Sequence, residues 1–587
     1  MREPIQRPKH GVRWISPALL SVALLAAACA SPQRQRDRAD RDVDRILRQQ
    51  QQELFDRDET LAIERPADTL RRQLLLEQGL PHAGTNGPVS AEADAEQVFA
   101  IDLVTALGVG ARQSRDYQDR KEDIFRAALN LDTEAFAFDP ALAGTASSTY
   151  TENRAGEETQ RGILQSAALG ASRTLRTGAA LSSRIMFDLV RLLSLDRDTA
   201  YGIMADLSVT VPLLRGAGRA IVTEPLTQAE RNVMYAMLAF EDFKGTYAVR
   251  VATQYLQVLQ QQDQVQNALD NLERVDVSAD RAFRLAEAGR LPEIQVDQAQ
   301  QEALRARDRW LAAQSAYERS LDQLKVTLGL PADARVALDG ADLTGLIDAV
   351  ADDNEGMDEP VRVGIEAQWT EDEATRLALA QRRDLLVAQR RVEDAERGIQ
   401  VAADRLRWQA NLVASGQMGS RRGLGSAGLS NARLDPDEGV YGLGLEVEAP
   451  WSRRAARNAY RDSFIARDRA IRAVEELEDR IKVEIREALR VLVQARESMA
   501  IQARSVELAQ RRVDSTELFL QAGRAQIRDV LEAQEALVSA RNAFTAAVVT
   551  YRLAALQLQR DMGVLAVDED GQWTEFAGID PMEVEGD

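Results

Sequence analysis

The chain carries an internal repeat, and this repeat restricts the possible folds more than any other feature of the sequence. Gly289-Arg290 recurs as Gly523-Arg524, and the same offset of 234 residues holds without a gap to the pair Gly329 and Gly563. Between these points the offset also matches Ala, Gln, Arg and Tyr positions in register. Self-similarity at a fixed spacing indicates a duplicated structural unit.

Both copies of the repeated segment have the apolar periodicity of long helices. In the first copy, apolar residues recur at every third or fourth position from Asn232 to Ala288 and again from Ile294 to Leu328. The first of these stretches is roughly 57 residues, or about 85 Å of helix, which is too long for a compact globule. Each copy is therefore expected to be an antiparallel helical hairpin with coiled-coil packing. Gly289 and Gly523 mark the reversals.

Shorter segments ahead of the helices have the period of β-strands. Every second residue is apolar from Ile203 to Leu213, and Tyr441 to Ala449 alternates in the same way. Weaker alternation over 175–189 and 408–418 supplies one partner strand for each. We therefore expect four strands, each with an apolar and a polar face. The polar positions, expected to face water, include Asp206, Ser208, Thr210, Glu446 and Glu448.

The N-terminal segment predicts export. A basic start precedes an apolar run from Trp14 to Ala28, and this run of roughly 15 residues is too short to cross a bilayer but suits a signal-peptide core. Small residues stand directly before Cys29, the only cysteine. This arrangement resembles a bacterial lipobox, which implies that Cys29 is lipidated. The alternative is ordinary secretion with an incidental cysteine.

The composition argues against catalysis and against nucleic acid as a partner. The chain has one cysteine and two histidines, and His10 lies in the expected signal peptide. This leaves little for a metal site or for Ser–His chemistry, so we expect no cofactor, no metal and no catalytic residue. The net charge of −20 opposes phosphate binding.

The duplicated order of helix, strand pair and helical hairpin behind a lipobox resembles the TolC-like outer-membrane efflux protein family, lipoprotein type. The motifs that carry the resemblance are PLLRG (212–216), AGR (288–290), LGLP (328–331), AGR (522–524) and DVLEA (529–533). The resemblance implies a mainly α fold with a small β part. Three chains would contribute four strands each to a twelve-stranded transmembrane β-barrel, which leaves no free sheet edge.

The resemblance also implies a function. The chain would be the outer-membrane channel, or exit duct, of a tripartite efflux or type I secretion system. It would form a homotrimer, work with a periplasmic adaptor protein and an inner-membrane pump, and be anchored in outer-membrane lipid. Asp529 and Glu532 match the acidic residues that constrict the periplasmic end of the tunnel. The expected adaptor contacts are the tips Gly289, Arg290, Gly523 and Arg524.

Other interpretations remain open at this stage. Asp529 and Glu532 lie three residues apart on a helix, so they also fit an ordinary solvated helix face. The whole chain could instead be a non-porous, lipid-anchored periplasmic coiled-coil scaffold, although that alternative gives no role to alternating strands. An enzyme on a helical stalk would need a clustered nucleophile and base, which the sequence does not contain.

These observations divide the chain into six segments. They are a signal peptide (1–28), a polar linker (29–95), a first repeat (96–331), an acidic connector (332–375), a second repeat (376–565) and a C-terminal tail (566–587).

Overall fold

The structure is a computed structural model that describes residues 31–56, 69–80, 98–154, 160–193, 199–353, 369–427, 429–568 and 570–574. The predicted signal peptide, Cys29 and both histidines lie outside these residues. The chain forms two compact units. Unit 1 comprises residues 1–60, 125–234 and 393–468, and unit 2 comprises 61–124, 235–392 and 469–587. Both units therefore draw on both halves of the repeat.

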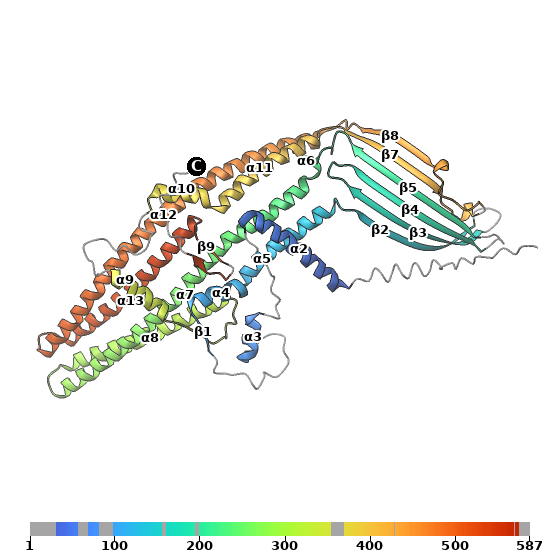
Figure 1. Cartoon of the computed structure of the whole chain (residues 1–587). Coiled ribbons are helices and arrows are strands. Elements are labelled where there is room, and N and C mark those ends of the chain that lie inside the picture. Colours follow the sequence, from blue (N-terminus) through green and yellow to red (C-terminus); the bar gives the residue numbers. More distant parts are fainter. Residues whose placement is uncertain are drawn as a thin grey trace, which may run out of the picture. The chain divides into compact units, whose positions relative to one another are not determined.

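Unit 1 contains a six-stranded antiparallel sheet (Figure 1). Its strands pair in chain order: β2 (Ala141–Asn153), β3 (Gln160–Thr174), β4 (Ala180–Leu192), β5 (Ala200–Pro212), β7 (Gln409–Ser420) and β8 (Val440–Glu448). The two halves of the repeat meet where β5 pairs with β7, and Leu207 lies opposite Gly416 there. Strands β2 and β8 form the two edges of the sheet.

The expectation of four strands was wrong, because the described sheet has an additional hairpin made of β2 and β3. Strands β4, β5, β7 and β8 are the four expected ones. In β2 most positions hold Thr, Ser, Ala or Gly, and only Leu142 and Tyr150 are large. Small and polar residues produce no apolar alternation for a sequence pattern to reveal. The hairpin is inserted between α5 (Arg115–Phe136) and β4.

The sheet has one predominantly apolar face and one predominantly polar face. The strand register places these exposed apolar side chains on one side, the apolar face: Leu142, Leu169, Ile185, Phe187, Leu207, Leu443 and Leu445. The opposite side, the polar face, carries Ser147, Ser166, Arg184, Asp206, Gln417 and Glu446. The added hairpin continues both faces, so all six strands share one amphipathic surface.

Helices of unit 1 are tied together by ion pairs near the sheet. They are α2 (Pro32–Phe55), α6 (Arg219–Val222) and parts of α5, α7 (Glu224–Glu287), α11 (Arg383–Asp404) and α12 (Arg454–Gln521). Arg231 of α7 pairs with Asp394 of α11 at 2.8 Å. Arg397 of α11 pairs with Glu224 of α7 at 3.0 Å. These ion pairs fix the start of α7, which follows β5, against the part of α11 that leads into β7.

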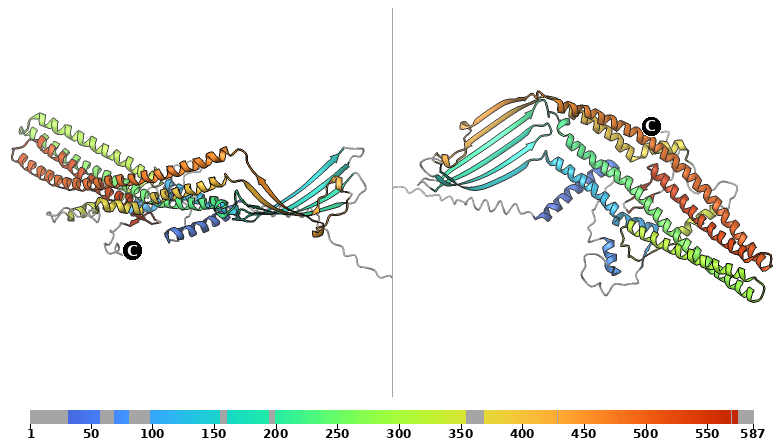
Figure 2. Two further views of the ribbon diagram at one scale, coloured as in Figure 1. Left: turned by 90° about the horizontal axis from the view of Figure 1, so that it is seen from above. Right: turned by 180° about the vertical axis from the view of Figure 1, so that it is seen from behind.

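Unit 2 contains two helical hairpins of matching construction (Figure 2). The second helices, α8 (Glu293–Thr327) and α13 (Ile527–Asp561), each have 35 residues and begin 234 residues apart. Fully buried Ala282, Ala299 and Ala306 pack with Ile527 and Leu531, so small side chains join the first hairpin to α13. The duplication seen in the sequence is therefore a duplication of structure.

Two segments expected to be a linker and a connector contain folded elements. In 29–95, helix α2 buries Val43 and Leu47, and α3 is a second helix (Leu70–Glu77). In 332–375, β6 (Val336–Leu338) pairs in parallel with β1 (Phe99–Ile101), and α9 follows (Ala341–Asp353). The remaining elements of unit 2 are α4 (Leu103–Gln113), α10 (Glu371–Gln381), β9 (Ala566–Val567) and β10 (Trp573–Thr574). The polar and acidic composition of the two segments concealed short apolar runs, such as Leu343, Leu346 and Ile347 in α9.

No helix among the described residues has an apolar stretch of the length needed to cross a membrane.

Candidate channel wall, gate and hairpin tips

The two hairpin tips in unit 2 have the same local geometry. Gly289 has φ 70°, and the N–H of Arg290 donates to a carbonyl oxygen five residues earlier at 2.8 Å. Gly523 has φ 68°, and the N–H of Arg524 makes the corresponding bond at 2.8 Å. A left-handed residue with this bond ends many helices, and a side chain there costs about 1–2 kcal/mol. The four predicted tip residues therefore sit in two equivalent turns.

Asp529 and Glu532 lie at the start of α13, one turn beyond the second tip. A carboxylate oxygen of Asp529 accepts a hydrogen bond from the backbone N–H of Gln526 at 2.9 Å, so Asp529 also caps the helix. The guanidinium of Arg528 lies 3.6 Å from Glu532 and 4.0 Å from Asp529. The side chains of Asp529 and Glu532 are 41% and 57% exposed in the single chain. Both carboxylates are accessible, and both have a local cation.

The first hairpin has no acidic residue at the equivalent positions. The offset of 234 residues places Gln295 and Gln298 there, and Gln295 is half-buried while Gln298 is exposed. At these two positions the acidic pair is therefore present in the second hairpin alone.

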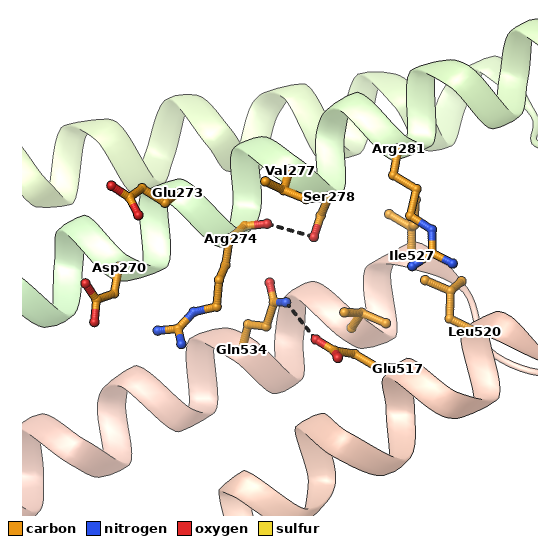
Figure 3. A pocket seen from close by; sticks show the side chains of 11 residues that line it. Asp270, Glu273, Arg274, Val277, Ser278, Arg281, Glu517, Leu520, Ile527 and Gln534 are labelled. Carbon is orange, nitrogen blue, oxygen red and sulfur yellow. Dashed lines mark hydrogen bonds between the residues drawn. The ribbon is translucent and has the colours of Figure 1, made fainter.

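An open groove of about 530 Å³ lies beside the tips, between α7, the end of α12 and the start of α13 (Figure 3). Charged side chains of both signs line it: Asp270, Glu273, Arg274, Arg281 and Glu517. Gln534 forms part of the wall, is 4% exposed and donates to Glu517 at 3.4 Å. The Oε1 atom of Gln534 has no hydrogen-bond partner among the described residues. The groove is therefore polar, open and adjacent to the residues expected to meet a partner.

Asp206, Glu446 and Glu448 occupy the polar face of the sheet, as the alternation predicts. Asp206 lies opposite Arg184 on the neighbouring strand, and both acidic residues of β8 are exposed. The sheet therefore brings the three predicted residues to one surface.

Sequence reasoning missed a buried ion pair on the same face. Asp188 of β4 has a side chain only 1% exposed and lies 3.0 Å from the guanidinium of Arg421. The hydroxyl of Ser166 donates to Asp188 at 2.7 Å. An aspartate at a polar position of an apolar strand was the available signal. Its partner lies 233 residues away, so no local pattern connects the two.

A charged cluster in unit 2 joins residues 382–384, at the start of α11, to α7 and α12. Arg382 lies 2.7 Å from Asp384 and 2.5 Å from Glu484. Arg383 lies 3.5 Å from Asp242. Burial disfavours the charged carboxylate and raises the pKa of Asp242 to about 6, although Arg383 opposes the shift. The cluster lines a cavity of about 210 Å³.

The described part of the chain contains no group of three or more Cys, His, Asp and Glu side chains arranged to hold a metal ion.

Comparisons with known proteins identify the fold. No family model matches the sequence, and no curated protein matches it either. Solved structures do match: the chain has the fold of TolC-like outer-membrane efflux channels. The expected mainly α fold with helical hairpins and a small β part is thereby confirmed.

Three of the matching structures show the extent of the likeness. The outer-membrane channel OprN has a TM-score of 0.54 at 15% identity, over 78% of this chain and 89% of that one. The CmeC outer-membrane channel of Campylobacter jejuni has a TM-score of 0.54 at 13% identity, over 79% of this chain and 85% of that one. The open state of the MtrE outer-membrane channel of Neisseria gonorrhoeae has a TM-score of 0.54 at 12% identity, over 79% of this chain and 89% of that one. All three are channels rather than enzymes.

Proposed function

We propose that this chain is an outer-membrane exit duct of a tripartite efflux or type I secretion system. It exports substrates delivered by an inner-membrane pump or taken from the periplasm. The observation that carries the proposal is the amphipathic sheet of unit 1, whose edge strands β2 and β8 are each paired on one side only. A sheet with a lipid-compatible face and free edges needs further copies to close it.

Three copies remove every edge. If β8 of one copy pairs with β2 of the next, the barrel has eighteen strands, since each chain supplies six rather than the expected four. The apolar face with Leu207 and Leu443 meets lipid. The polar face with Asp206, Glu446 and Glu448 lines the lumen, and a barrel of this size encloses an aqueous channel.

The duplicated hairpins of unit 2 form the wall of a periplasmic tunnel. Asp529 and Glu532 form stacked acidic rings at its end, one pair from each copy, and attract cations. Arg528 lies close enough to both carboxylates to hold them in place. The glycine turns at Gly289 and Gly523, with Arg290 and Arg524, contact a periplasmic adaptor.

Two further assignments complete the proposal. The groove beside the tips has charges of both signs and suits a polar helical partner such as an adaptor hairpin. Cys29 carries lipid and anchors the chain in the outer membrane. The alternative of a non-porous scaffold leaves the six-stranded amphipathic sheet without a role.

Single-channel recording in planar bilayers tests the duct and its gate together. The purified full-length protein is expected to give stepwise, cation-selective currents. The double substitution Asp529→Asn and Glu532→Gln removes both ring charges and is expected to lower the preference for cations over anions several-fold, because ring charges select ions. Asp348→Asn, an exposed acidic residue of α9, is the matched control and should leave selectivity unchanged.

Two outcomes contradict different parts of this proposal. A trimeric, lipid-inserted wild-type protein without current would rule out the duct. Current whose selectivity is the same in the double variant would leave the duct standing and reduce Asp529 and Glu532 to a solvated helix face.

A further inference from the structure

The segment between β7 and β8 folds back over the polar face of the sheet. It leaves β7 at Ser420, and it contains the short helices η2 (Leu424–Ser426) and η3 (Pro436–Glu438). It connects the strand ends opposite those where α11 and α12 join the sheet (Figure 1). We define residues 421–427 and 429–432 as the inner loop.

Two glycines show which face the inner loop covers. A Cβ built on Gly162 of β3 would lie 2.2 Å from the side chain of Leu424, and one on Gly202 of β5 would lie 2.6 Å from the backbone N of Arg422. Both Cβ positions point to the side of Asp188, which the register pairs with Gly202. The inner loop therefore rests directly on the backbone of β3 and β5, on the polar face.

The polar face changes its chemistry where the inner loop covers it. At this end of the sheet, Val190, Leu192 and Ala200 take the positions that are polar elsewhere on the same side, and they are 0%, 8% and 3% exposed. Leu424 and Ala427 pack on them. Apolar side chains on a water-facing surface require cover. The residues of β4 and β5 at this end of the sheet therefore match a loop that packs on them.

Polar bonds hold the inner loop at both of its ends. Asp188 accepts hydrogen bonds from the Arg421 guanidinium at 3.0 and 3.2 Å, and from the backbone N–H of Arg422 at 3.4 Å. The backbone N–H of Tyr201 donates to Asn431 at 3.0 Å, and that of Ala432 donates to the carbonyl of Tyr201 at 3.0 Å. A buried carboxylate with a charged partner is a specific latch, because an unpaired charge there is very costly.

From these contacts we propose that the inner loop is a built-in constriction inside the barrel, at the end remote from the helices, where it limits the size of what leaves the duct. This inference rests on the proposed function, since it takes the polar face as the lumen wall. The constriction is separate from the acidic residues Asp529 and Glu532, which belong to unit 2. Three copies place three inner loops around one mouth, and these loops narrow it.

Conductance of a shortened loop is the test. Deleting residues 424–427 removes the part that covers the apolar patch and is expected to raise single-channel conductance by a factor of about 1.5 or more, because an obstructing segment leaves the lumen. Asp188→Asn removes the ion pair with Arg421 but keeps the loop. This variant is expected to switch between the wild-type conductance and a higher conductance. The double substitution Asp437→Asn and Glu438→Gln, in the exposed η3 part of the same connection, should change neither property.

Cysteine labelling checks the seat of the loop without reference to current. In the wild-type background, Ala427→Cys is expected to react with a bulky maleimide at least about tenfold more slowly than Ser430→Cys, because Ala427 is 6% exposed and Ser430 is exposed. Adding Asp188→Asn should speed labelling at position 427.

The outcomes separate the two proposals. If the wild type conducts and the 424–427 deletion forms normal trimers with unchanged conductance, the constriction is ruled out while the duct stands. Equal labelling of positions 427 and 430 would also overturn the constriction. If the wild type never conducts, the duct itself fails.

Discussion

Single residues in this chain do two kinds of work, and burial distinguishes them. Within the chain, Gly289 and Gly523 are needed only for their backbone angles, because a Cβ at either position would meet no atom within 4 Å. Asp188 and Asp242 are instead carboxylates that lose some or all of their contact with water, and each is paired with an arginine. Asp188 is fully enclosed, whereas the side chain of Asp242 is 38% exposed.

The raised pKa of Asp242 makes a pH-dependent prediction. A carboxyl group whose pKa is higher in the folded state binds more protons when folded, so its contribution to stability falls as pH rises from about 4 to about 6. As pH rises across this window, the Asp242→Asn variant should therefore become more stable relative to wild type, and its melting temperature should rise accordingly. The gain in unfolding free energy is at most about 1 kcal/mol, because solvent screens the partly exposed carboxyl group. Thermal unfolding of the detergent-solubilised protein at pH 4.5 and 7 measures the difference.

Asp102 provides the control with the opposite sign. A hydrogen bond from the Thr105 side chain, together with one from the Thr105 backbone N–H at 2.7 Å, lowers the pKa of this carboxyl group. The stability of the wild type relative to Asp102→Asn should therefore increase as pH rises up to about 4 and stay constant above it. Parallel trends for the two variants would show that burial of Asp242 does not control its protonation.

At the scale of elements, the hairpins depend on small side chains. Ala282, Ala299 and Ala306 are fully buried where α7, α8 and α13 meet, and this lets the helices approach closely. The repeat offset relates Ala299 to Ala533, which is also fully buried and packs with Val513 and Leu537. The two hairpins thus use one packing solution at equivalent points.

Enlarging these alanines should destabilise both hairpins to a similar extent. Ala299→Leu and Ala533→Leu are each expected to cost about 1–3 kcal/mol, since extra methylene groups in a packed core force backbone shifts. Ala299→Ser, which is nearly the same size, should cost less. Chemical denaturation, monitored by circular dichroism, gives the free energies of unfolding. A Leu variant as stable as the Ser variant would show that the packing at this point is loose.

At the scale of the whole molecule, the inserted β2–β3 hairpin sets the number of strands. Both of its ends lie where α5 leads into β4, so removing it leaves a simple connection. The four remaining strands keep the β5–β7 pairing that joins the two halves of the repeat. The hairpin is therefore an addition to a four-stranded sheet in which the two halves of the repeat are already paired.

Deleting residues 141–174 should narrow the channel. Three copies would then contribute twelve strands instead of eighteen, and barrel diameter scales roughly with strand number. Single-channel conductance is expected to fall by up to about twofold, the ratio of the enclosed areas. Native mass spectrometry establishes that the variant is still a trimer. An unchanged conductance in that trimer would place β2 and β3 outside the barrel wall.

Much of the fold could be predicted from the local spacing of apolar residues in the sequence. The helical hairpins, their reversals at Gly289 and Gly523, and strands β4, β5, β7 and β8 all follow from residue spacing over one or two turns or a few alternations. The same spacing placed Asp206, Glu446 and Glu448 on one face. Such features are legible because each depends on residues close together in the chain.

Only the tertiary structure decided the rest, because the deciding contacts join distant residues. The hairpin of β2 and β3 lacks the apolar alternation of the other strands, and it joins the sheet through the pairing of β3 with β4. The inner loop is seated by Asp188 and Arg421, which are 233 residues apart. Burial raises the pKa of Asp242, and Arg383 of another helix opposes this shift. The sequence by itself determined a duplicated set of helical hairpins and strands, and long-range pairing decided the width of the sheet and what covers its polar face.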